Sequence, residues 1–112
     1  MSTEPLPQHI ACIAACNACA DACDHCAAAC LREADLPMLA RCIALDVDCA
    51  ILCRICTGFM ARGSEFSARL CLCCAEVCDA CAISCASHSH EHCQRCAEAC
   101  RRCAQACRQM AA

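Results

Sequence analysis

Residues 12–30 read CIAACNACADACDHCAAAC, and the six cysteines in this stretch follow one another at gaps of 4, 3, 4, 3 and 4 residues. Steps of three and four keep side chains on one face of an α-helix. A helix normally buries Leu, Ile or Val along such a face, because its apolar stripe packs on the core. The pattern therefore predicts a helix that turns thiols, rather than aliphatic side chains, toward the interior.

The same cysteine spacing recurs three more times along the chain, between breaks that suit helix ends. Asp35 can cap a helix with Pro37 in its first turn, Gly63 is a typical C-terminal stop, and Ser64 can cap the helix that follows. The helices are predicted at 7–33, 36–61, 64–86 and 89–109. Short connections between helices of this length predict an all-α, antiparallel up-down-up-down four-helix bundle with a Cys-lined core. We expect one such domain over residues 1–112.

Twenty of the 21 cysteines lie on these four inward ladders. The predicted metal ligands are Cys12, Cys16, Cys19, Cys23, Cys26, Cys30, Cys42, Cys49, Cys53, Cys56, Cys71, Cys74, Cys78, Cys81, Cys85, Cys93, Cys96, Cys100, Cys103 and Cys107. Cys73 falls off the ladder and is not predicted to face the core.

The composition excludes several other classes of protein. The chain has few bulky aliphatic residues and no Trp or Tyr, so a purely structural bundle would lack its core. The net charge is −3 and the nine basic residues are scattered, which does not indicate a nucleic-acid-binding surface. Without a basic N-terminal region or a long uncharged apolar run, we expect no signal peptide, no membrane partner, and a cytoplasmic protein with reduced thiols.

Thiolate ligands select Cu(I), Zn(II) or iron–sulfur clusters. Several zinc ions with four thiolates each would bury many net negative charges, whereas about one Cu(I) per thiolate leaves a nearly neutral core. Iron–sulfur clusters need only a few cysteines. The sequence thus favours many Cu(I) ions per chain. A zinc or mixed-metal thiolate buffer remains the alternative. A thiol–disulfide oxidoreductase is less favoured, because no CxxC pair is distinguished from the others, so we predict no enzyme activity.

The chain resembles the cytosolic bacterial copper storage proteins over essentially its whole length. The resemblance rests on the cysteine ladders, on the segment HSHEHC at residues 88–93, and on the ending CAQACRQM at residues 103–110. It implies a homotetramer of Cu(I)-filled four-helix bundles that buffers toxic copper and exchanges it with copper chaperones or cuproenzymes.

Seven further residues are candidate metal ligands: Asp46, His88, His90, His9, Met38, Met60 and Met110. Antiparallel packing would gather His9, Met60 and Met110 at one end of the bundle, and Met38 with the two other histidines at the opposite end. Thioether and imidazole are neutral ligands suited to passing an ion inward. Asp46 occupies an inward position among thiols.

Two more histidines and one apolar stripe complete the predictions. His92 is less favoured as a ligand than His88 and His90, because at a solvated helix start it would turn outward, and we expect His25 to lie on the surface or in an interface. A second stripe beside the second cysteine ladder consists of Leu39, Ile43, Val47, Ile51, Ile55 and Phe59. It predicts packing against another subunit, or else the sealing of helix–helix seams.

Overall fold

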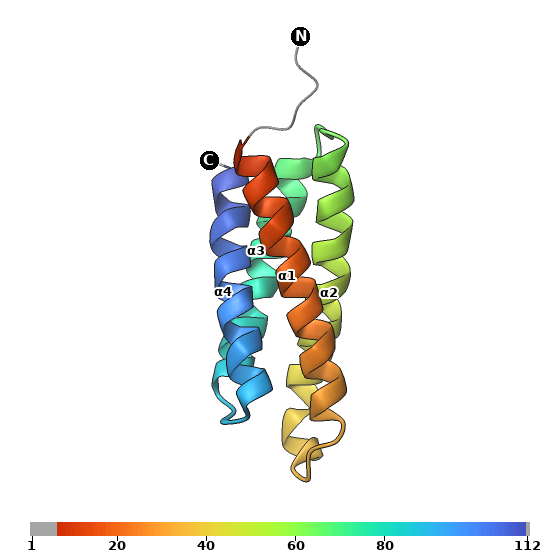
Figure 1. Cartoon of the computed structure of the whole chain (residues 1–112), viewed down its shortest axis with the longest axis vertical. Coiled ribbons are helices and arrows are strands. Elements are labelled where there is room, and N and C mark those ends of the chain that lie inside the picture. Colours follow the sequence, from red (N-terminus) through yellow and green to blue (C-terminus); the bar gives the residue numbers. More distant parts are fainter. Residues whose placement is uncertain (1–6, 112) are drawn as a thin grey trace.

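The computed structural model describes residues 7–111 and consists of four long helices packed side by side (Figure 1). The elements are α1 (Pro7–Cys30), the short 3-10 helix η1 (Leu36–Leu39), α2 (Ala40–Ala61), α3 (Ser67–Ala86) and α4 (Glu91–Ala111). Residues 7–111 contain no β-strand. The predicted all-α four-helix bundle is confirmed.

The helices form a closed ring around the core. Both α1 and α3 pack against α2 and α4, and the bundle measures 55 × 20 × 18 Å. Figure 1 shows the start of α1, the α2–α3 connection and the end of α4 at one end of the bundle. We call this the methionine end (residues 7–11, 60–67 and 110), and the opposite one the histidine end (residues 31–39 and 87–92).

Some helix ends differ from the predicted ones. Helix α1 ends at Cys30, three residues early, whereas α3 and α4 begin at Ser67 and Glu91, later than predicted. Gly63 has φ 67° and stops α2 as expected, because glycine adopts this left-handed conformation at little cost. Asp35 precedes η1, but its side chain makes no capping hydrogen bond.

The interior is built from cysteine and alanine. All twenty ladder cysteines are fully buried, and small Ala side chains such as Ala20, Ala50 and Ala97 lie beside them. The largest fully buried side chains include only one aliphatic residue, Leu39, and one methionine, Met60. The helices therefore meet across sulfur atoms rather than across branched aliphatic groups.

The 3-10 helix η1 changes which side chains face inward before α2. A 3-10 helix has three residues per turn, so it breaks the phase of the α-helical ladder. Leu39 is fully buried, whereas Met38 is 73% exposed. The prediction that Met38 lies on the inward face is wrong, and Leu39 does not belong to the outward apolar stripe.

The remaining stripe lies on the outside of α2. Val47, Ile51 and Ile55 are all exposed, and Ile43 and Phe59 are half-buried.

Over the described residues, none of the helices combines the length and the apolar character needed to cross a bilayer.

Candidate metal-binding core

The ladder thiols form a continuous column along the bundle axis. Cys19 Sγ lies 3.6 Å from the Sγ atoms of Cys49 and Cys100, which belong to α2 and α4. Further along the column, Cys53 Sγ lies 3.6 Å from Cys74 Sγ and 3.7 Å from Cys103 Sγ. Contacts of this kind bring sulfur atoms from different helices within reach of one small ion.

The column contains overlapping groups of four thiols whose sulfur atoms all lie within 4.8 Å of one another. They include Cys16–Cys74–Cys103–Cys107, Cys19–Cys23–Cys49–Cys100, Cys19–Cys49–Cys53–Cys78, Cys23–Cys81–Cys96–Cys100 and Cys26–Cys30–Cys42–Cys93. Successive groups share members: Cys23 and Cys100 each belong to two of them, as do Cys19 and Cys49. Shared sulfurs suit bridging thiolates, in which one ligand binds two neighbouring ions.

All 21 cysteines are free thiols, and Cys73 alone is exposed, as the sequence predicts. Burial raises the pKa of the Cys30 and Cys93 thiols above the usual value, because a thiolate is poorly solvated there. Such thiols stay protonated until a cation replaces the proton. A metal ion that binds them must therefore release protons.

Asp46 lies inside the column. It is fully buried, and its Oδ1 accepts S–H contacts from Cys81 at 3.1 Å, Cys96 at 3.2 Å and Cys85 at 3.4 Å. Burial, together with the nearby Cys96, raises the pKa of this carboxyl to about 8. The predicted inward position of Asp46 is confirmed, and it adds an oxygen to an otherwise sulfur-lined site.

At the histidine end it is His92 that reaches the thiols. Its Nδ1 lies 3.5 Å from the Sγ atoms of Cys26 and Cys93 and 3.8 Å from Cys30 Sγ. His92, ranked below His88 and His90 as a ligand, thus turns inward and not outward. Because α4 begins at Glu91, His92 is already helical and stands one turn before Cys96, a spacing visible in the sequence.

His88 and His90 precede α4 and do not follow its helical phase. His90 Nδ1 lies 2.9 Å from Glu33 Oε2, and its Nε2 lies 3.0 Å from Asp35 Oδ1. His90 therefore faces the two carboxylates of the α1–α2 connection and not the column. The ring of His88 is half-buried and makes no hydrogen bond to a thiol in residues 7–110.

The methionine end is lined by softer and less polar groups. Met60 is 1% exposed, and its Sδ lies 3.8 Å from Cys71 Sγ, as its inward position predicts. Met110 is half-buried against the core, and His9 is half-buried. The sequence pattern does not single out Ser67, which is buried one turn before Cys71 and whose Oγ has no hydrogen-bond partner within residues 7–110.

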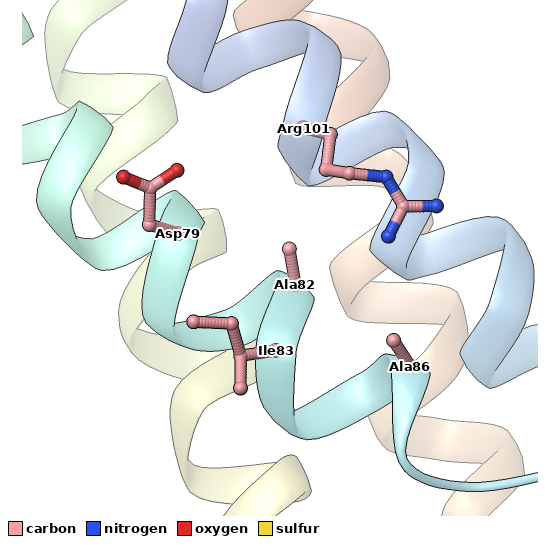
Figure 2. Close-up of a pocket in the computed structure, with 5 residues that line it drawn as sticks. All are labelled: Asp79, Ala82, Ile83, Ala86 and Arg101. Atoms are coloured by element: carbon pink, nitrogen blue, oxygen red, sulfur yellow. The ribbon is translucent and has the colours of Figure 1, made fainter.

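The outer surface carries features that are separate from the column. His25 is exposed, in agreement with its predicted surface position. A hollow of about 460 Å³ lies between α3 and α4 and is lined by Asp79, Ala82, Ile83, Ala86 and Arg101. Figure 2 shows Asp79 and Ile83 projecting from α3, with Arg101 on α4 across from them. No thiol lines this hollow, so it is not part of the metal-binding core.

A helical bundle whose interior is a column of shared thiol quartets belongs to the class of proteins that bind soft metal ions through thiolates. The comparisons with known proteins narrow this class. The family model described as copper storage protein matches residues 7–112. The chain belongs to the copper storage protein family.

Solved structures of the family are closely similar. The Cu(I)-bound copper storage protein BsCsp3 is 45% identical with a TM-score of 0.90, over 94% of this chain and 99% of that chain. The metal-free copper storage protein 3 of Bacillus subtilis is 45% identical with a TM-score of 0.85, over 91% and 97%. A cytosolic copper storage protein of Streptomyces lividans with five coppers is 41% identical with a TM-score of 0.90, over 93% and 92%. No curated protein matches the chain.

Proposed function

We propose that this protein stores many Cu(I) ions in its column of thiols and so buffers copper in the cytosol. The observation that carries the proposal is the set of buried thiol quartets that share members along the axis. One quartet could hold one ion, but a continuous series is suited to a store. The Cu(I)-bound and cytosolic descriptions of similar proteins support the same role.

Charge favours Cu(I) over zinc as the cargo. Filling the column with Zn(II) would leave two negative charges for each tetrathiolate unit, in a core that holds no basic side chain among the described residues. Cu(I) with bridging thiolates leaves the core close to neutral. The expected ligands are the twenty ladder cysteines, with Asp46 and His92 as additional donors inside the column. His9, Met60, Met110 and His88 remain candidates at the two ends, whereas both ring nitrogens of His90 face carboxylates.

The proposal includes a homo-oligomer, and we expect a tetramer. The exposed stripe of Val47, Ile51 and Ile55 on α2 supports it, because adjacent apolar side chains on one helix face favour burial in an interface. Exchange of copper with a chaperone or a cuproenzyme would then occur at the ends of each bundle, which the α2 face leaves free.

A zinc or mixed-metal buffer and a thiol enzyme are the competing functions. A competition experiment distinguishes copper storage from the zinc or mixed-metal buffer. Reduced protein is mixed anaerobically with equimolar Cu(I) and Zn(II) and then passed through gel filtration. We expect Cu(I) to travel with the protein and Zn(II) to be displaced, whereas alkylated protein retains neither. Zinc that holds its place against equimolar Cu(I) contradicts copper storage. Turnover in a disulfide-reductase assay would instead indicate an enzyme.

A further inference from the structure

The histidine end contains a group of four ionisable side chains that leads from the surface to the last thiols of the column. Glu33 and Asp35 belong to the α1–α2 connection, and His90 and His92 belong to the α3–α4 connection and the start of α4. Glu33 lies between the two histidines and faces both of them. Its Oε2 lies 2.9 Å from His90 Nδ1, while its Oε1 lies 3.7 Å from His92 Nε2.

The two ring nitrogens of His92 face opposite surroundings. Nδ1 lies 3.5 Å from the thiols of Cys26 and Cys93. Nε2 is buried and makes no hydrogen bond within the described residues, but the Glu33 carboxylate stands on its side of the ring. A buried N–H needs an acceptor, and a small movement of Glu33 closes the 3.7 Å gap to a hydrogen bond.

The carboxylate also selects between the two neutral forms of His92. With the proton on Nε2, the N–H points toward Glu33 and the lone pair of Nδ1 points at the thiols. With the proton on Nδ1, the Nε2 lone pair would face a carboxylate oxygen, which is unfavourable. Histidines that bind metals commonly donate their second ring N–H to a carboxylate, which fixes the tautomer and the orientation of the ring.

Glu33 is itself held in place. His90 binds the Oε2 atom of Glu33 with one nitrogen, and its other nitrogen lies 3.0 and 3.1 Å from the two oxygens of Asp35. The rings of His90 and His92 are stacked, with centroids 5.3 Å apart and planes 5° apart. One face of the His92 ring is thereby covered, and its rotation is restricted.

We propose that Glu33 is a positioning residue for copper binding: it holds the proton of His92 on Nε2, so that Nδ1 is free to bind Cu(I) together with Cys26 and Cys93. The inference rests on the proposed function, in which His92 is a copper ligand. In this arrangement the His90–Asp35 pair acts on copper only through Glu33 and through the stacked ring.

The tautomer of His92 in the reduced, metal-free protein is the first test, read from its ring ¹⁵N shifts by NMR. We expect the Nε2–H form in the wild type and in Glu33→Gln, whose amide oxygen still accepts the N–H. Glu33→Ala should give a mixture of both forms. Glu65→Ala, which removes an exposed carboxylate at the methionine end, should match the wild type. An Nδ1–H form in the wild type, or no change in Glu33→Ala, overturns the proposal.

Copper affinity provides the second readout and tests whether Glu33 acts through His92. In competition with a Cu(I) chelator, Glu33→Ala should weaken the most readily lost copper by about tenfold, as is typical for partners of a metal-bound histidine. The same substitution in a His92→Ala background should add nothing further. Equal weakening in both backgrounds contradicts the proposal. Failure of the wild type to bind more than a few ions would instead refute copper storage, and it would leave the tautomer result standing.

Discussion

The two ends of the bundle close the same column of thiols with different chemistry. The histidine end brings His92 up to the last thiols, with the Glu33 carboxylate behind its ring, whereas the methionine end places the Met60 thioether against Cys71. Asp46 also lies toward the histidine end, among thiols of α3 and α4. One end therefore carries ionisable groups beside the thiols, and the other carries a buried, uncharged thioether.

The largest difference should appear in the stability of the metal-free protein. Met60 is 1% exposed, so Met60→Ala leaves a cavity at the methionine end and should cost about 2–4 kcal/mol of the free energy of unfolding. Met38→Ala is the matched control: Met38 is 73% exposed, and its loss should stay within about 0.5 kcal/mol. Chemical denaturation of the reduced proteins measures both. Similar losses in the two variants would contradict the different roles of these methionines.

The carboxyl in the histidine half should make stability depend on pH. The pKa of Asp46 is raised from 3.8 to about 8 in the folded protein, so this group favours the fold fully below pH 4. The advantage is lost as the pH rises from about 4 to 8, because the unfolded chain ionises while the folded chain keeps its proton. Asp46→Asn removes this loss and should be more stable than the wild type by about 1–3 kcal/mol at pH 8, with no gain at pH 4.

Denaturation of metal-free protein at pH 4, 6 and 8 checks this prediction. Asp24→Asn is a suitable control, because Asp24 is exposed and binds Arg54 on the surface. Stability curves of the wild type and of Asp46→Asn that run parallel across this range would show that Asp46 is not held protonated by burial.

The smallest effect is expected on copper exchange, which should differ between the two ends of the bundle. His92→Ala removes a neutral ligand from the histidine end, so a chelator should remove the first copper at least about tenfold more readily, since even outer partners of a metal-bound histidine are worth 10–100-fold in affinity. His25→Ala removes an exposed histidine from the outer surface of α1 and should leave exchange unchanged. Equal exchange in His92→Ala and the wild type would mean that the histidine end does not bind copper.

The regular parts of the molecule could be predicted from the sequence, and its junctions could not. The period of three and four fixes which face of a continuous helix is buried, and for that reason every ladder cysteine was placed correctly and Asp46 with them. Met38 was misplaced because η1 resets the helical phase just before α2. His92 was misplaced because the regular ladder of the fourth helix begins at its neighbour Cys93, although His92 also stands one turn before Cys96 and borders the same face.

The contacts of His90 show a second kind of feature that the sequence pattern does not predict. They join residues 33 and 35 to residue 90, and no local pattern in either segment indicates that the two connections meet. Only the antiparallel arrangement brings the α1–α2 and α3–α4 connections to the same end (Figure 1). Side-chain partners across that end depend on rotamers and loop paths, which periodicity does not determine.

Anaerobic titration of the reduced protein with Cu(I), beside a strong chelator, tests copper storage most directly. If the bridging thiolates hold about one ion each, binding should reach a plateau at about twenty Cu(I) per chain. Cys73→Ser should leave the plateau unchanged, because this thiol is exposed and off the column, whereas replacing Cys19, Cys49 and Cys100 together should lower it. A wild-type plateau at only a few ions would contradict the account.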